Sequence, residues 1–393
     1  MSLITHEVGA TAFWAQGFDG SGIDVAVIDS GVAPVEGLTA PGKVINGPDL
    51  SFDSQIPRLL HLDMYGHGTH MAGIIAGRDD GAAVESFTEA EQFRGIAPGS
   101  RIVNIKVADA TGAVDVSQVI AGIDWVVQHR NDNGLNIRVL NLSFGTDSIQ
   151  SPALDPLAFA VEQAWNHGIV VVAASGNDGI GTSVRNPAKD PFVIAVGAVR
   201  SDGRTDTDDQ VADFTSCSKE REVDLVAPGR SLVSLRVPES FIDQAHNGAV
   251  VDDRFFKGSG TSQSAAVVSG AVALLLEQRP YMTPDQVKAL LMDTASPAKG
   301  PAECKGSGML DLHKAILTPS LSVANSVQNA TASTGTGTLQ GARSSSALGG
   351  SQSPLVGEID IFGNPWDAAA WAPSSAAGSA WDGGDWNGTS WSG

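Results

Sequence analysis

The chain has 393 residues, and its 44 acidic and 24 basic side chains give a formal net charge of −20 at pH 7. This length allows one large α/β domain or two smaller ones with a sizeable core, and the acidity argues against nucleic acid or an anionic membrane as a partner. No segment approaches the roughly 18 consecutive apolar residues of a membrane span.

The N-terminus lacks the charged-then-apolar order of a signal peptide. We therefore expect a mature or trimmed form.

The first predicted strand, 23–28, is rich in β-branched residues and ends at Asp29. In an open parallel sheet, functional groups collect at the carboxyl ends of the strands, so a carboxylate here could orient a histidine. For Asp29 viewed alone, capping of the turn is the more common role.

Glycines and small residues open the next helical pattern, 66–77, which carries His67 and His70 near its start. The segment has no His-Glu-x-x-His arrangement, so we favour a general base at His67 over a metal site. Imidazole suits that role because it titrates near neutral pH.

Strands and helices then alternate along the chain. Apolar runs predict strands at 102–107, 139–142, 169–173, 192–199 and 224–227, and helical spacing predicts helices at 116–130, 155–168 and 283–293. This order is typical of an α/β fold with a doubly wound, mostly parallel sheet and helices on both faces. We expect this domain to span residues 1–316.

Two further elements carry candidate functional groups. Asn177 follows the strand at 169–173 in a glycine-flanked turn, where its amide could donate to an oxyanion or simply hold a left-handed turn. Ser262 lies at the start of the helix predicted at 258–278, which is apolar on nearly every face. Backbone N–H groups and the helix dipole there could stabilise an oxyanion, although an N-cap serine is the common alternative.

The sequence leaves metal content and cysteine pairing open. Cys217 and Cys304 are too few for a metal cluster and could form one disulfide or remain two thiols. Asp206, Asp208 and Asp209 offer hard oxygen ligands, so structural calcium is possible, with a solvated acidic loop as the alternative.

From 317 to 393 the composition shifts to Ser, Gly, Ala and Thr, which predicts a low-complexity tail partly docked on the body. Five tryptophans would be costly to leave in water, so we expect them to contact the body, a cell surface or a glycan. They are Trp366, Trp371, Trp381, Trp386 and Trp391.

Three segments in the order Asp, His, Ser resemble the signatures of the subtilisin-like serine peptidases: Val27–Gly31, Gly66–Gly73 and Gly260–Ser262. The resemblance covers Gly9 to Ile316. It implies a secreted serine endopeptidase that cleaves polypeptides through an acyl-enzyme and needs no cofactor for the chemistry. It also implies that the signal peptide and the propeptide have been lost from this chain. It also implies the roles of four residues: Asp29 as orienting acid, His67 as base and then acid, Ser262 as nucleophile, and Asn177 as oxyanion-hole donor.

The resemblance also implies two extended substrate edges, one formed by Gly112, Ala113 and Val114 and the other by Ser143, Phe144 and Gly145. Gln263 follows the nucleophile where the family usually has methionine.

By the same resemblance, Arg185 falls at the floor of the pocket for the residue on the acyl side of the cut. There it could pair with a substrate carboxylate. Alternatively it turns outward to Asp178, Asp190 or solvent, which would leave an apolar pocket.

A second hypothesis is a catalytically idle binding protein that the tail attaches to a surface. The complete set of Asp, His, Ser and Asn residues speaks against it.

Overall fold

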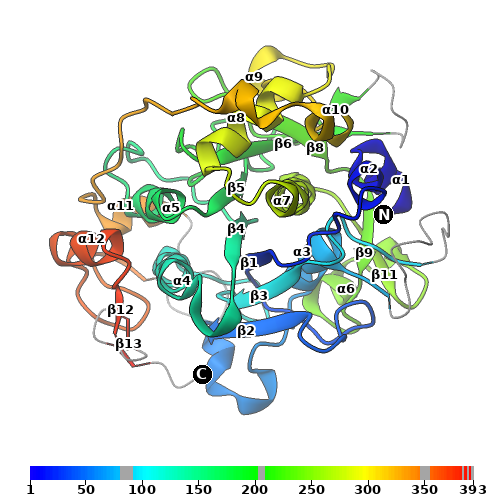
Figure 1. The fold of residues 1–393 in the computed structure, drawn as a ribbon. Helices are drawn as coiled ribbons and strands as arrows, with labels where there is room; N and C mark the ends of the chain where they lie inside the picture. The colour runs from blue at the N-terminus through cyan, green and yellow to red at the C-terminus, as the bar shows by residue number, and fades with distance from the viewer. Residues whose placement is uncertain (80–91, 202–208, 346–354, 383–384, 387–388, 391–393) are drawn as a thin grey trace.

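The computed structural model describes the chain except residues 80–91, 202–208, 346–354, 383–384, 387–388 and 391–393 (Figure 1). Its central sheet contains β1 Asp24–Asp29, β2 Val44–Asp49, β3 Arg101–Lys106, β4 Ile137–Leu142, β5 Val170–Ala174, β6 Ile194–Arg200, β7 Gln210–Val211 and β8 Leu225–Pro228. The strand order is β2-β3-β1-β4-β5-β6-β7, and β8 also pairs with β6.

All pairings in this sheet are parallel except that of β6 with β7. β1 lies between β3 and β4, with Asp29 opposite Lys106 and Ile28 opposite Leu142. Parallel strands end at one edge, so the residues that follow β1, β4 and β5 meet there. The mainly parallel α/β fold that the sequence predicts is confirmed.

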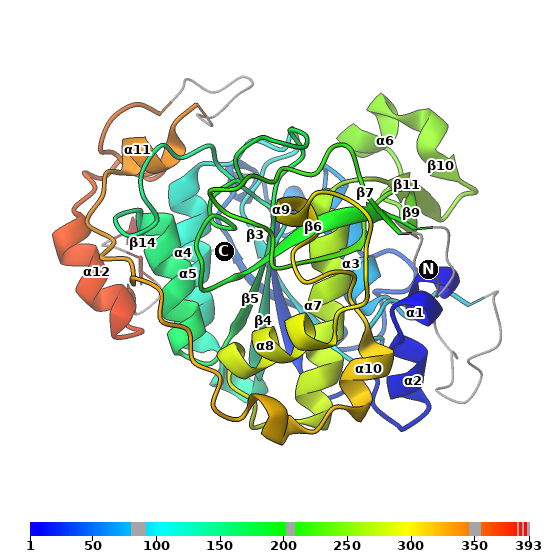
Figure 2. The ribbon, with the colours of Figure 1, turned by 90° about the horizontal axis from the view of Figure 1, so that it is seen from above.

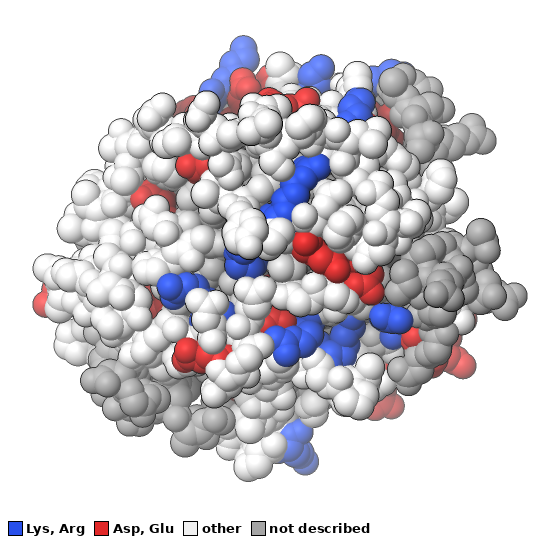
Figure 3. Space-filling view, viewed as in Figure 1, with Lys and Arg blue, Asp and Glu red and all other residues white. Residues whose placement is uncertain are grey.

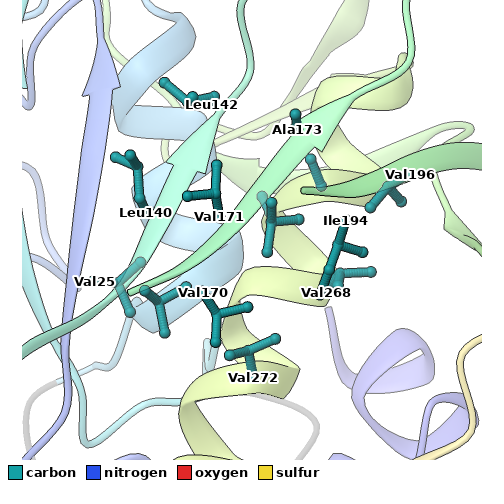
Figure 4. Close-up of a cluster of buried hydrophobic side chains, with 14 of the residues drawn as sticks. Val25, Leu140, Leu142, Val170, Val171, Ala173, Ile194, Val196, Val268 and Val272 are labelled. Atoms are coloured by element: carbon teal, nitrogen blue, oxygen red, sulfur yellow. The ribbon is translucent and has the colours of Figure 1, made fainter. Parts of the chain in front are cut away.

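Five longer helices cover the sheet: α3 His67–Ala76, α4 Val116–His129, α5 Pro156–Asn166, α7 Thr261–Gln278 and α8 Pro284–Thr294. Helices α4 and α5 lie on one face, and α3 and α7 lie on the other (Figure 2). Figure 4 shows Val268 and Val272 of α7 among side chains of β5 and β6. The all-round burial of α7 follows from its apolar composition, and this burial fixes the position of its first turn.

Other elements are shorter. The helices are α1 Ser2–Glu7, α2 Ala10–Trp14, α6 Phe241–Ala245, α9 Ala302–Lys305, α10 Leu312–Leu317, α11 Leu339–Arg343 and α12 Ala368–Ala376. Strands β9 Leu232–Leu235, β10 Val250–Val251 and β11 Phe255–Gly258 form a second sheet, and β12 Trp381–Asp382, β13 Asp385–Trp386 and β14 Thr389–Ser390 form a third. The 3-10 helices are η1 Phe52–Gln55, η2 Pro57–Leu59, η3 Asp132–Gly134, η4 Asn247–Ala249 and η5 Ser320–Val323.

A disulfide joins Cys217 to Cys304, which settles the alternative that the sequence left open. Both residues are fully buried, and 87 positions separate them along the chain.

The C-terminal segment packs beside α4 and α5, where Figure 2 shows α11 and α12. Trp366, Trp371 and Trp381 are buried, and the indole N–H of Trp371 donates to Asp124 at 2.7 Å. These three side chains therefore contact the body and are not available to a glycan or a cell surface. The side chains of Trp386 and Trp391 lie outside the described part of the structure.

The surface carries charges of both signs. On the face shown in Figure 3, acidic and basic side chains lie among uncharged ones. In the described ranges, no helix has the length and apolar character needed to cross a membrane.

Candidate active site

Asp29 and His67 meet where β1 ends and α3 begins. Nδ1 of His67 lies 2.8 and 2.9 Å from the two carboxylate oxygens of Asp29. The close approach depends on Gly68, because a Cβ there would lie 2.3 Å from the carbonyl oxygen of Gly31. The glycines that flank His67 thus bring the helix start against the strand end.

A buried network that the sequence did not predict holds this pair. The Ser30 N–H donates to Asp29 at 2.8 Å, and the Ser30 hydroxyl donates to Asp63 at 2.8 Å and accepts from the Gly68 N–H at 2.9 Å. Asp63 also accepts the N–H groups of Gly66 and Thr69. Burial raises the pKa of Asp63. The one signal in the sequence was the short spacing of Asp63 from His67.

The two histidines differ in protonation. Burial disfavours the charged form of His67, but the adjacent Asp29 carboxylate outweighs this effect, so the pKa of His67 is raised. Burial, followed by repulsion from His67, lowers the pKa of His70 to about 4. Nε2 of His70 lies 3.1 Å from the carbonyl oxygen of Phe256, so this ring is held as a neutral donor. Only His67 is therefore suited to take up a proton near neutral pH.

Ser262 is the second residue of α7 and is 8% exposed. Its Oγ lies 3.4 Å from the carbonyl oxygen of Ser143, which follows β4. A cavity of about 390 Å³ is lined by Ser262 together with His67, Asn177 and Gln263. The structure thus brings the predicted serine, histidine and asparagine to one cavity.

Asn177 is oriented by the start of α7. Its Oδ1 accepts from the backbone N–H of Thr261 at 2.8 Å and lies 3.1 Å from the Thr261 hydroxyl. Because the carbonyl end of the amide is engaged in this way, the NH₂ end remains available as a donor to the cavity. Gly176 precedes it with a φ of 112°, a left-handed conformation that favours glycine.

Residues of both predicted substrate edges line a second cavity, of about 190 Å³, which His67 also lines. Gly112, Val114, Ser143 and Phe144 line it, together with Asp29 and His67. The remaining edge residues lie beside it: Ala113 exchanges hydrogen bonds with Asp109, and Gly145 lies against the Cβ of Arg185.

Arg185 lines neither of the two cavities. Its guanidinium donates to Asp178 at 2.7 and 2.9 Å, and its side chain is 30% exposed. This is the outward arrangement that the sequence offered as the alternative, and it follows from a carboxylate within reach of a two-point contact.

For the predicted calcium, the described residues contain no group of three or more His, Cys, Asp or Glu side chains that could hold a metal ion. Asp206 and Asp208 lie outside the described ranges, and Asp209 is buried.

Comparisons with known proteins identify the family of this chain. The model of the subtilase family matches residues 20–337. The chain is 36% identical over 286 residues to "Serine protease AprX" of Bacillus subtilis (strain 168), covering 70% of this chain and 62% of AprX. It is 34% identical over 312 residues to "Subtilisin" of Bacillus pumilus, covering 79% of this chain and 96% of that protein.

A third relative is "Minor extracellular protease Epr" of Bacillus subtilis (strain 168), 33% identical over 275 residues, which are 70% of this chain and 35% of Epr. The chain thus spans less than two thirds of AprX and about a third of Epr, but nearly all of the Bacillus pumilus protein. With a family match over most of its length, the chain belongs to the subtilase family.

Proposed function

We propose that this protein is a serine endopeptidase that hydrolyses peptide bonds through an acyl-enzyme. The observation that carries the proposal is the shared cavity: His67, hydrogen-bonded to Asp29, faces the same space as Ser262 and Asn177. An unactivated serine hydroxyl is a weak nucleophile, so it needs a neighbouring base that a third group orients.

In the first half of the reaction, Oγ of Ser262 attacks the carbonyl carbon and its proton passes to Nε2 of His67. The Asp29 carboxylate at Nδ1 stabilises the resulting imidazolium. The oxyanion accepts hydrogen bonds from the Asn177 amide and the Ser262 backbone N–H. Collapse of this intermediate breaks the C–N bond, and His67 gives its proton to the leaving amine.

In the second half, a water molecule attacks the acyl ester while His67 takes one of its protons. Breakdown of the second intermediate releases the carboxylic acid product and returns the proton to Ser262. The side chains present supply every proton transfer, so the chemistry requires no cofactor.

The two cavities suggest in which direction the substrate chain runs through the site. The acyl side would lie along 112–114 and 143–145 as an added strand, and the leaving side would occupy the larger cavity beside Gln263. We propose polypeptides as the substrates and an extracellular location. The disulfide supports that location, because such bonds persist in oxidising compartments. The name of the relative Epr, an extracellular protease, supports it as well.

Labelling with a fluorophosphonate tests the proposal, because the reagent requires a working nucleophile. We expect one label, at Ser262, lost in Ser262→Ala and kept in Ser259→Ala, which removes an exposed serine from the same cavity. An idle binding protein would take no label. Absence of label in the wild-type chain, or a label at another serine, would refute the proposed function.

A further inference from the structure

The geometry points to a positioning role for residues 338–345, which we call the clamp: they hold both substrate edges in place, with Arg343 as the main positioning residue. The inference rests on the proposed function, because it takes 112–114 and 143–145 as the segments that bind the substrate. The clamp contains α11 and begins directly after residue 337, where the match to the family ends.

Arg343 fixes the first edge through Asp115. Its Nε donates to Oδ2 of Asp115 at 2.5 Å and its Nη2 to Oδ1 at 3.3 Å, and both side chains are fully buried. Asp115 directly follows Val114 and caps α4 by accepting from the Ser117 N–H at 2.9 Å. A two-point contact between a planar guanidinium and a carboxylate restricts both distance and orientation.

The remaining donors of Arg343 tie it to the rest of the C-terminal segment. Nη1 donates to the carbonyl oxygen of Gly357 at 2.7 Å, and Nη2 also donates to that of Ile359. The guanidinium therefore connects three parts of the chain at one buried point. Loss of its contact with Asp115 would leave a buried carboxylate without its partner, which is strongly unfavourable.

The same clamp holds the second edge through the residues that follow Gly145. The side chain of Gln150 donates to the carbonyl oxygen of Thr338 and accepts from its N–H, each at 2.8 Å. The hydroxyl oxygen of Ser148 lies 3.1 Å from the carbonyl oxygen of Gly341. A Cβ at Gly341 would lie 2.6 Å from the carboxamide carbon of Gln150, so the approach depends on glycine.

One short segment thus contacts the loops after both edges, and α11 packs against both α4 and α5 (Figure 2). The cavity of about 190 Å³ lies between these edges, so its width depends on how the two are held relative to each other. Loosening of the clamp should weaken the binding of a substrate that extends along both edges. It should not weaken the binding of a substrate that reaches only Ser262.

Two N-acetylated esters with the same residue at the cut, a tetrapeptide and a single amino acid, separate these effects. Arg343→Lys keeps the charge but loses the two-point contact, and Gln150→Ala removes the contact on the other edge. For both variants we expect KM for the tetrapeptide ester to rise about tenfold, with kcat/KM for the single-residue ester nearly unchanged.

Trp371→Phe is the matched control, because it removes a buried hydrogen bond of the C-terminal segment to Asp124, away from both edges. We expect it to lower Tm without changing KM for either ester. If Arg343→Lys does not fold, Gln150→Ala decides the matter, since Gln150 lies in a half-exposed loop of the body.

The inference is overturned if the variants lose equally on the two esters, if neither ester is affected, or if Trp371→Phe changes KM in the same way. The clamp would then have only a structural role. The proposed function would stand, provided that the wild-type enzyme is active and takes the label. A wild-type chain that cleaves neither ester and takes no fluorophosphonate overturns both.

Discussion

Glu162 of α5 and Asp190 are two buried acids that lie beside each other, and Glu162 contacts Ser333 of the C-terminal segment. Burial, followed by repulsion from Asp190, raises the pKa of Glu162 to about 8, and burial raises the pKa of Asp190 to about 6. Glu162 also accepts the N–H of Ser333 with both carboxylate oxygens, at 2.8 and 2.9 Å. The pair thus retains a proton in the folded state at pH values where the unfolded chain has lost it.

Because both pKa values are raised on folding, this contribution to stability is complete below the ordinary carboxyl range and is lost as the pH rises through about 6 to about 8. Glu162→Gln replaces the protonated acid by an amide of the same shape. We expect the Tm of the variant to exceed that of wild type at pH 9 and not to exceed it at pH 5. If the difference in Tm between Glu162→Gln and wild type were constant from pH 5 to pH 9, the explanation by a retained proton would be contradicted.

Removal of the proposed oxyanion donor should affect turnover rather than binding. For Asn177→Ala we expect kcat to fall about 10²- to 10³-fold, the loss known for removal of such an asparagine from subtilisin, with KM nearly unchanged. Thr261→Ser is the control, because it keeps the N–H that holds Asn177. Steady-state kinetics on one peptide substrate checks both, and a rise in KM alone would assign Asn177 to substrate binding.

The acid limb of the pH–activity profile should report His67. Activity requires a neutral imidazole, and the Asp29 carboxylate raises the pKa of this ring despite the opposing effect of burial. We therefore expect kcat/KM to fall with a midpoint above the ordinary histidine value of about 6.5. His70→Gln should leave the midpoint above that value, because the His70 ring is already neutral there. A midpoint below it would show that Asp29 does not control the base.

Dilute hydrogen peroxide should leave activity largely unchanged. Gln263 lies directly after the nucleophile and lines the larger cavity, and glutamine has no thioether to oxidise. Gln263→Met places one there, so we expect the variant, but not wild type, to lose activity on the same exposure. Equal and rapid inactivation of both would point to another oxidisable group.

Reduction of the disulfide should lower stability. The bond between Cys217 and Cys304 closes a loop with a sequence separation of 87, for which the loss of unfolded-state entropy amounts to about 4.6 kcal/mol. We expect a clear drop in Tm for the double variant Cys217→Ser and Cys304→Ser, and no further drop when a reductant is added to it. An unchanged Tm would mean that the surrounding packing alone holds these two segments together.

The sequence predicted the central sheet because β-branched runs such as those of β1 and β5 leave little alternative to a buried parallel strand. It missed β2, a half-buried edge strand interrupted by Gly47 and Pro48. It also missed the small sheet of β9, β10 and β11, where β10 has only two residues.

In the candidate site, too, the sequence predicted some residues and missed others. Asp29, His67, Asn177 and Ser262 each lie in a recognisable local pattern at the end of an element, and the fold brings them together. The supporting contacts of Asp63 and Ser30, and the direction of Arg185, depend on distances between segments remote in sequence. The clamp is the extreme case, since 228 positions separate Asp115 from Arg343.

The disulfide has a consequence for a protease exposed to its own activity. The covalent ring between Cys217 and Cys304 encloses α7 with Ser262, and it includes Tyr281, which is 95% exposed. A cut at such a site opens the ring but leaves the two pieces joined through sulfur, so the fragment with α8 and the C-terminal segment stays attached to the fragment with Asp29, His67 and Ser262. A single autoproteolytic cleavage in this region therefore produces a two-chain molecule rather than two separate fragments.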